Sequence, residues 1–506
     1  MKMVKSLVLG SAATLLAMGG AQAADLPVKA KAVEYVKVCS LYGAGFWYIP
    51  GTDTCIKLGG YLRVDVGVNT NSDNTGNFSG AGAAKNRFTD GYIWRSREDL
   101  NIDTRTATEY GVLRTFFDAT FTWTDDSYAG NGTGATIYSP IGTASAPNNA
   151  NAGAVAAGTV GVYYAFIQFA GFTIGHSVSS FDFTSYQNYG YLAPIGASSG
   201  VNGIDLMAYT WQLGNGVSVS VDLEDGKNAR SNNIINVNGA SIGAGGAFSS
   251  TNGLNNNSSR AWTPDFAGNI RIDQAWGSAQ ISGALHNNTA GQLGVAPAVT
   301  AVGPDNWGYA LQAGIRLNNF LMPKDMIEGA VVYSKGALGY ALTNPNQQLY
   351  GAGNSVAVGW APDVVFNQAG QSELTEAWTF SGAYEHNWNN QWRTSIFAYG
   401  TQVNFSDNAR TMLCAAPATY NSAVTGAGFS NCSPNFSQQQ LSTRTAWNPH
   451  PTLEIGLDLI WLHADTANAG TATLAATATG RQAGTYVVED QDKYMAILRV
   501  IKTILP

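Results

Sequence analysis

The stretch Cys55-Ile-Lys-Leu-Gly-Gly-Tyr-Leu-Arg-Val-Asp-Val-Gly-Val-Asn69 decides the fold, because apolar and polar side chains alternate along it. Isoleucine, leucine and valine occupy one parity, whereas Lys57, Arg63 and Asp65 occupy the other. Successive side chains of a strand point to opposite faces, so this pattern predicts a strand with one apolar and one charged face. The run exceeds the roughly 9–11 residues that a tilted strand needs to cross a bilayer. Apolar outside and polar inside is the pattern of a membrane-spanning β-barrel.

The same alternation recurs along the chain, with successive strands joined in turn by long loops and short turns. Gly214-Asn215-Gly216, for example, is a hairpin signal between two such runs. Sixteen strands are predicted, at 56–68, 91–103, 109–123, 160–169, 172–177, 204–213, 217–225, 266–273, 276–286, 306–318, 326–335, 377–387, 391–404, 438–447, 452–465 and 490–502. We therefore expect an all-β fold, a transmembrane antiparallel β-barrel with long extracellular loops and short periplasmic turns.

Tryptophan residues occur at both ends of the predicted strands. They lie beside long loops at Trp94, Trp123, Trp307, Trp378 and Trp461, and beside short turns at Trp211, Trp276, Trp392 and Trp447. Aromatic side chains gather at both water–lipid interfaces of membrane barrels. Tryptophans that cap a soluble β-sandwich are the alternative, but the occupation of both strand ends along the whole chain favours the barrel.

The composition excludes several protein classes. Charged residues make up 12% of the chain, against about 25% in typical soluble domains. Hydrophobic residues make up 45%, and the 58 glycines are accompanied by many Asn, Ser and Thr. This profile argues against helix bundles and highly charged disorder, and it favours β-structure with long polar loops. A formal net charge of −7 with few lysines predicts no nucleic-acid partner.

Residues 1–23 have the pattern of a secretory signal peptide. Lys2 and Lys5 precede a short apolar run, and a small-x-small motif predicts cleavage between Ala23 and Ala24. An uncleaved membrane anchor is the alternative, but the apolar run is short and rich in Ala and Gly. After the leader, we expect a periplasmic N-terminal segment (24–55) with a disulfide loop, followed by the barrel (56–506).

The four cysteines are expected to form two disulfides. A zinc site is disfavoured, because no pair has close spacing and no His lies nearby. Cys39 and Cys55 precede the first strand on the periplasmic side, whereas Cys414 and Cys432 lie in a long loop outside. A membrane of about 30 Å separates the two pairs, and a disulfide needs Cα atoms within about 7 Å. The predicted pairing is therefore Cys39–Cys55 and Cys414–Cys432.

The strongest candidate site is a cluster of charges on the inward parity of the first three strands. Its members are Arg63, Asp65, Arg95, Arg97, Asp99, Arg114 and Asp118. An Arg facing lipid at mid-membrane would cost about 2–4 kcal/mol, so these side chains must face water or protein. Sixteen strands enclose a water-filled interior, where rings of charge set ion preference. Two interpretations stay open, a wall that acts on passing solutes and paired charges that only brace the barrel.

The third long loop, about 178–200, is the candidate constriction. Its aromatic side chains are unusual for an exposed loop and could pack it inside the barrel, where Asp182 would face the arginines across the lumen. The alternative is an ordinary external loop whose aromatics pack on neighbouring loops. No motif for catalysis or for metal or nucleotide binding is found, and the five histidines are scattered. We therefore expect no enzymatic activity, no metal and no cofactor.

The N-terminal region resembles the alphaproteobacterial outer-membrane porins. The resemblance rests on Ala21-Gln-Ala-Ala-Asp25, Val33-Glu-Tyr-Val-Lys-Val-Cys39, the run Gly43–Cys55, and Leu58-Gly-Gly-Tyr-Leu-Arg63. It implies a 16-stranded trimeric general-diffusion porin whose third loop folds into the lumen. Barrels of this kind usually end in an aromatic residue, whereas this sequence ends Leu505-Pro506. Because Pro cannot donate to a sheet, the last strand is expected to stop before it.

Together these observations predict a passive, water-filled channel of the Gram-negative outer membrane. Ions and small hydrophilic solutes would pass through it, and its partners would be outer-membrane lipid, lipopolysaccharide and two further copies of the chain in a homotrimer. The alternatives are a substrate-selective channel and a secreted β-solenoid adhesin. A solenoid needs a fixed repeat, and none is visible.

Overall fold

The computed structural model describes sixteen ranges of the chain, which contain the barrel strands and parts of the loops. They are residues 37–70, 92–124, 154–155, 158–183, 188–192, 203–227, 230, 232–237, 263–291, 303–342, 346–350, 354–367, 369–415, 428–429, 431–474 and 484–504. The predicted signal peptide with its cleavage site at Ala23 and Ala24 lies outside them. So do residues 24–36 and parts of the third long loop (184–187 and 193–200).

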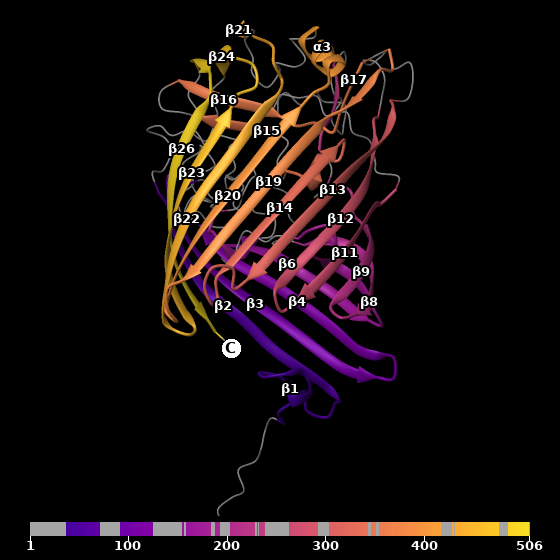
Figure 1. Cartoon of the computed structure of the whole chain (residues 1–506), viewed down its shortest axis with the longest axis vertical. Coiled ribbons are helices and arrows are strands. Elements are labelled where there is room, and N and C mark those ends of the chain that lie inside the picture. The colour runs from indigo at the N-terminus through magenta and orange to yellow at the C-terminus, as the bar shows by residue number, and fades with distance from the viewer. Residues whose placement is uncertain are drawn as a thin grey trace, which may run out of the picture.

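Sixteen antiparallel strands close into a barrel (Figure 1). They are β2 (Thr54–Val68), β3 (Tyr92–Thr108), β4 (Gly111–Thr124), β6 (Gly158–Phe169), β7 (Phe172–Ser177), β8 (Ile204–Gly214), β9 (Val217–Glu224), β11 (Asp265–Gln274), β12 (Gly277–Thr289), β13 (Asp305–Asn318), β14 (Met326–Lys335), β19 (Glu376–Asn387), β20 (Trp392–Asn404), β22 (Phe436–His450), β23 (Leu453–Asp465) and β26 (Gln491–Thr503). Each strand pairs with the next, and the pairing of β2 with β26 closes the ring. The predicted fold class and strand number are confirmed, and β26 stops before the terminal Pro, as expected.

The alternation in the sequence becomes the two faces of the wall. On β2, Leu62 and Val68 are exposed on the outer face, whereas Arg63 and Asp65 are buried on the inner face. The outer tryptophans are exposed near both rims, at Trp94, Trp123, Trp307, Trp378, Trp211, Trp276 and Trp392. Trp392 stacks on Trp447 at a centroid distance of 5.7 Å beside the short turns. The outer face is therefore apolar and carries aromatics at both rims, as in membrane barrels.

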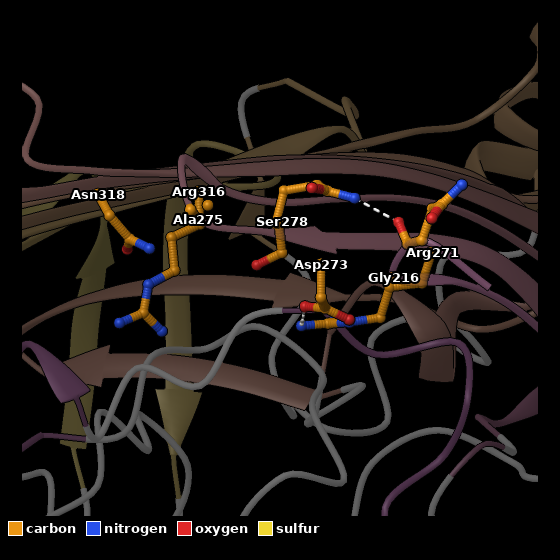
Figure 2. A pocket seen from close by; sticks show the side chains of 10 residues that line it. Gly216, Arg271, Asp273, Ala275, Ser278, Arg316 and Asn318 are labelled. Atoms are coloured by element: carbon orange, nitrogen blue, oxygen red, sulfur yellow. Dashed lines mark hydrogen bonds and ion pairs between the residues drawn. The ribbon is translucent and has the colours of Figure 1, made fainter. Parts of the chain in front are cut away.

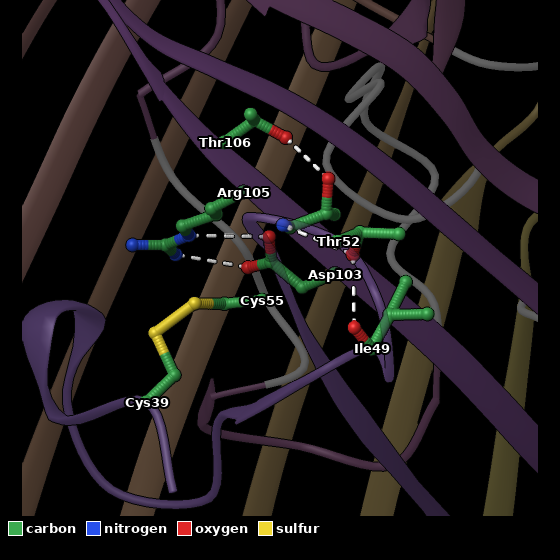
Figure 3. The surroundings of a disulfide bond; sticks show 8 residues. Cys39, Ile49, Thr52, Cys55, Asp103, Arg105 and Thr106 are labelled. Carbon is green, nitrogen blue, oxygen red and sulfur yellow. Dashed lines mark hydrogen bonds and ion pairs between the residues drawn. A yellow bond between two sulfur atoms is a disulfide. The ribbon is translucent and has the colours of Figure 1, made fainter. Parts of the chain in front are cut away.

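The boundary between the second and third predicted strands is wrong. The sequence pattern placed a break around 105–108, between the strands 91–103 and 109–123, but β3 continues to Thr108 and pairs with β4 throughout. The end of β3 is held by Arg105, whose guanidinium lies 2.9 Å from Asp103 (Figure 3). The same guanidinium lies 4.9 Å from the ring of Phe46 in the N-terminal segment. Contacts of Arg105 with Asp103 and with the N-terminal segment therefore accompany the continuation of β3 where the local sequence suggested a break.

Both predicted disulfides are present. Cys39–Cys55 joins the N-terminal segment to β2 (Figure 3), where β1 (Trp47–Tyr48) also pairs with β2. Cys414–Cys432 links α3 (Asp407–Ala415) to the chain that leads into β22. The two bridges lie at opposite ends of the barrel (Figure 1), which is the physical reason for the predicted pairing.

Small elements that the sequence did not predict cover the end opposite the short turns (Figure 1). They form two sheets besides the barrel, one of three strands and one of five. These elements are β10 (Ile234–Asn236), β17 (Val364–Phe366) and β18 (Ser372–Leu374) in the first sheet, β15 (Asn346–Tyr350), β16 (Ser355–Trp360), β21 (Gly428–Phe429), β24 (Gly470–Leu474) and β25 (Gly484–Val488) in the second, with β5 (Ala154–Val155), η1 (Ser40–Tyr42) and η4 (Leu338–Tyr340) elsewhere. Across the described ranges, no helix is long and apolar enough to cross a membrane.

Candidate functional site

The third long loop follows the inner face of the barrel in both of its described parts. The first part (178–183) contacts inward side chains of β11 and β12, and the second (188–192) contacts those of β14, β20, β22 and β23. We call the strands from β9 to β23 the loop-covered wall, and β2, β3 and β4 the arginine wall. The polar side chains on the inner face of the strands thus form hydrogen bonds with the backbone of the loop, which is shielded from bulk water.

Neutral side chains hold the first part of the loop. The Gln280 amide lies 3.1 Å from the carbonyl oxygen of Phe181, and the Ser282 hydroxyl donates to the same oxygen at 2.7 Å. Phe183 occupies a notch at Gly314, where an added Cβ would lie 2.2 Å from the Phe183 ring. An inward glycine therefore provides the space for this loop aromatic.

Acidic side chains hold the tip of the loop. Tyr189 is fully buried, and its hydroxyl donates to Glu328 at 2.8 Å. The Ser395 hydroxyl donates to the Tyr189 carbonyl at 2.6 Å. Burial first, and then the Glu328 carboxylate, raise the pKa of Tyr189, so its hydroxyl stays protonated and acts as a donor.

Tyr191 is fixed to β23 at two points. Its backbone N–H donates to Asp458 at 2.7 Å, and its hydroxyl donates to Glu454 at 2.7 Å. Between these two acids lies Gly456, where an added Cβ would stand 1.9 Å from the Tyr191 hydroxyl. Arg499 covers the ring of Tyr191 at 4.2 Å from its centroid. The tip therefore fits a notch in β23 and is clamped by acids and an arginine.

Asp182 lies against the β11–β12 wall, on the opposite side of the barrel from β2. Its ion-pair partner is Arg230, at 3.1 Å, and both side chains are at least 96% buried. Arg230 was not among the residues predicted from the sequence. Burial alone would lower the pKa of Arg230, but Asp182 and Glu224 raise it, so the arginine remains charged. Asp182 is thus held in an ion pair at the base of the loop.

The arginine wall is organised around one carboxylate. The Asp65 side chain is fully buried and accepts from Arg95 at 2.9 Å and from Arg499 at 2.6 Å. Arg63 also lies 3.1 Å from it. Three predicted residues (Arg63, Asp65 and Arg95) are thereby brought together, and Arg499 joins them because β26 closes the barrel beside β2. Three guanidinium groups therefore converge on one buried carboxylate.

The other predicted residues of the arginine wall form separate contacts. Arg97 donates to Thr122 at 2.8 Å and to the Tyr163 hydroxyl. Nearer the short turns, Arg114 binds Asp103 at 3.0 Å and is not part of the Asp65 group. Asp99 and Asp118 lie on the same inward parity of β3 and β4, in adjacent register positions.

Two cavities open near the short-turn end of the barrel. One, of about 530 Å³, lies beneath the loop tip and is lined by Tyr61, Arg63, Asn188, Tyr191, Arg316, Met326, Glu385, Asn387, Arg393, Arg444, Glu454, Arg499 and Ile501. The other, of about 720 Å³, lies at β11–β13, where Figure 2 shows Arg271 beside Asp273 with Arg316 and Asn318 nearby. Within the described ranges, no group of three or more His, Cys, Asp or Glu is arranged to hold a metal ion.

The acids that hold the loop tip, Glu328, Glu454 and Asp458, were not among the predicted site residues. All three lie on the inner face, but nothing in the local pattern distinguishes an acid that binds a loop from one that faces water. One signal was available, since inward glycines such as Gly314 and Gly456 interrupt otherwise polar faces at the places where loop aromatics dock. Glycine inside a strand often marks a site of close approach.

Comparison with known proteins gives a consistent assignment. The family model described as "Porin subfamily" matches residues 25–495. Porin Omp2a of Brucella ovis is 38% identical over 234 residues, which are 44% of this chain and 60% of that protein. Porin Omp2b of Brucella suis biovar 1 (strain 1330) is 33% identical over 282 residues, 54% of this chain and 64% of that protein. The chain therefore matches less than two thirds of the length of these relatives.

A solved structure shares the fold. The outer-membrane channel DcaP of Acinetobacter baumannii aligns with a TM-score of 0.55 and 12% identity, covering 90% of this chain and 99% of that one. At this identity the similarity concerns the barrel architecture alone.

Proposed function

We propose, from the premise that the chain belongs to the porin subfamily, that it forms a passive, water-filled channel for ions and small hydrophilic solutes. Family and fold together place it in the outer membrane of a Gram-negative bacterium. The observation that carries the channel function is the closed ring of sixteen strands with apolar side chains outside and charges inside. A ring of this size is too wide for its own side chains to fill.

The third loop is the constriction in this proposal. Its tip is clamped to β23 by Tyr191, and its base is held by the Asp182–Arg230 pair. The loop therefore narrows the lumen from one side, and solutes pass between it and the arginine wall. The charges along this passage are those of Arg63, Asp65, Arg95, Arg97, Asp99, Arg114 and Asp118, whereas the buried Asp182 fixes the loop base through its ion pair with Arg230. Charge in a narrow lumen orients polar solutes and biases ion entry.

The assembly follows from the same premise. We propose a homotrimer whose barrels contact outer-membrane lipid and lipopolysaccharide through the aromatic rims, with a signal peptide that ends at Ala23. Transport down a gradient needs no cofactor and no catalytic group, so we expect no enzymatic activity.

Planar-bilayer recording tests this function. Refolded protein should give large ohmic conductance in KCl with closure in three steps, one for each pore of a trimer. Heat-modifiable migration on gels verifies that the barrel is folded before recording. Absence of conductance from folded protein would refute the open channel, and closure in a single step would refute the trimer of independent pores.

A further inference from the structure

We propose that the cavity beneath the loop tip is a binding site for small multivalent oxyanions, meaning small solutes that carry two or more carboxylate or phosphate charges. The inference rests on the proposed channel function and names a class of solute that the channel holds in transit. It is carried by five arginines that line one cavity of about 530 Å³. Cavities of this size fit small organic ligands.

The cavity is built where the two walls of the barrel meet. Arg63 on β2 and Arg499 on β26 form one side, and Arg316, Arg393 and Arg444 come from β13, β20 and β22. The loop tip closes it toward the extracellular side, since Asn188 and Tyr191 belong to its lining. The remaining lining residues, such as Met326 and Asn387, lie next to short turns. The cavity therefore opens toward the periplasmic mouth.

The arginines of this cavity are not neutralised one for one. Arg393 and Arg444 contact the acids Glu454 and Glu385. Arg63 and Arg499 both contact the buried Asp65. The lining as a whole holds five arginines and two acids, so a multivalent anion adds negative charge where the lining has least of it. Charges in a partly enclosed site interact more strongly than in water.

Two arginines are accessible enough to bind a solute directly. Arg316 and Arg393 expose 34% and 26% of their side chains, and the nearest acid to Arg316 is Glu328 at 4.0 Å. A guanidinium presents its N–H groups in a fork that matches a carboxylate or phosphate. The site therefore selects planar or tetrahedral oxyanions over chloride by geometry as well as charge.

The cavity at β11–β13 provides the contrast. There Arg271 binds Asp273 through two bonds of 2.8 and 2.9 Å, so this arginine is neutralised by its own acid (Figure 2). Its side chain is 32% exposed, close to the value for Arg393. Arg271 thus resembles Arg393 in exposure and position near a short turn, but it does not line the cavity beneath the loop tip.

The test is block of KCl current by added anions in a planar bilayer. Citrate and inorganic phosphate are the probes, acetate at equal ionic strength is the monovalent control, and each is added to one side at a time. We expect citrate or phosphate to reduce conductance saturably, more effectively from the periplasmic side, with acetate inactive. Block by citrate alone assigns the site to carboxylates, and block by phosphate alone assigns it to phosphates.

Arg393→Gln removes an accessible arginine together with its ion pairs to Glu454 and Glu385, so the half-blocking concentration should rise by about tenfold or more. Arg271→Gln is the matched control and should shift it by less than about twofold. Arg63→Lys is a second variant that keeps the charge but removes the fork, and it should raise the half-blocking concentration of citrate and phosphate relative to the unmodified protein. Normal conductance without block by either probe, or equal effects of the Arg393 and Arg271 variants, would overturn the proposed site. Absence of conductance would instead refute the channel itself.

Discussion

The loop-covered wall and the arginine wall both point their polar side chains into the barrel, but these side chains have different partners in the two walls. On the loop-covered wall, Glu328, Glu454 and Asp458 bind the loop tip, so these acids anchor the loop to the barrel. On the arginine wall, Arg63 and Arg95 converge on the buried Asp65 and are joined by Arg499 of the neighbouring β26, so these charges hold the wall strands to each other and not to the loop. The difference shows that inward orientation alone does not assign a role to a charge. The partner that the fold supplies decides whether the charge is structural or faces a solute.

The largest expected effect comes from the centre of the arginine wall. Asp65→Asn removes the carboxylate that three buried guanidinium groups share, which should lower the free energy of unfolding by about 3–5 kcal/mol. The matched control is Asp273→Asn, whose carboxylate is 55% exposed and pairs with one arginine, and it should cost about 0–1 kcal/mol. Urea titration of the refolded barrel in detergent, followed by tryptophan fluorescence, measures both. Equal losses would show that sharing of Asp65 does not hold the wall together.

A smaller effect should come from a glycine of the loop-covered wall, compared with a glycine on a strand outside both walls. Gly456→Ala on the loop-covered wall places a methyl group 1.9 Å from the Tyr191 hydroxyl, so the loop tip must move. Overpacking of this kind costs about 1–3 kcal/mol. Gly161 on β6 is the control, because an added Cβ there meets nothing closer than 3.4 Å and should be nearly neutral.

Single-channel recording provides the second readout for this pair. Gly456→Ala should change the conductance or increase current noise, because the displaced tip alters the narrowest part of the lumen, whereas Gly161→Ala should leave both unchanged. If the two alanine variants behave alike, the notch at β23 does not position the loop.

The smallest effect concerns the turn beneath the loop-covered wall. Asp325 accepts bonds from the Tyr384 hydroxyl at 2.6 Å, from His386 at 3.0 Å and from the Asn387 N–H at 3.2 Å. Burial alone would raise the pKa of Asp325, but these bonds lower it below its ordinary value of 3.8. The stabilisation is therefore complete above the unfolded-state pKa and is lost as the pH falls through the lower, folded-state pKa.

Asp325→Asn should cost about 1 kcal/mol at neutral pH and should flatten the acid limb of the stability curve. Thermal unfolding from pH 7 down to pH 2 measures this difference. An unchanged acid limb in the variant would assign the pH dependence to other carboxylates.

Much of the architecture could be predicted because strand periodicity is a local property. The alternation in 55–69 identifies an inward and an outward face of the strand. Because the same pattern recurs, the number of strands can be counted, and the strand count places the two pairs of cysteines at opposite ends of the barrel. The break expected at 105–108 failed because Arg105 finds its aromatic partners in the N-terminal segment, which no window around the strand contains.

The sequence by itself determined the barrel, the direction of its charged face, its disulfide pairing and the residues of the arginine wall. Only the tertiary structure decided how those charges are partnered. Closure of the barrel brings Arg499 to Asp65 across 434 positions of the chain, and the loop brings Tyr191 to Asp458 across 267. The position of a residue in the alternating pattern shows on which face its side chain lies. Which charge it pairs with depends on distances that are set by closure of the barrel and by the path of the loop. That is why the surplus of positive charge beneath the loop tip becomes visible only in three dimensions.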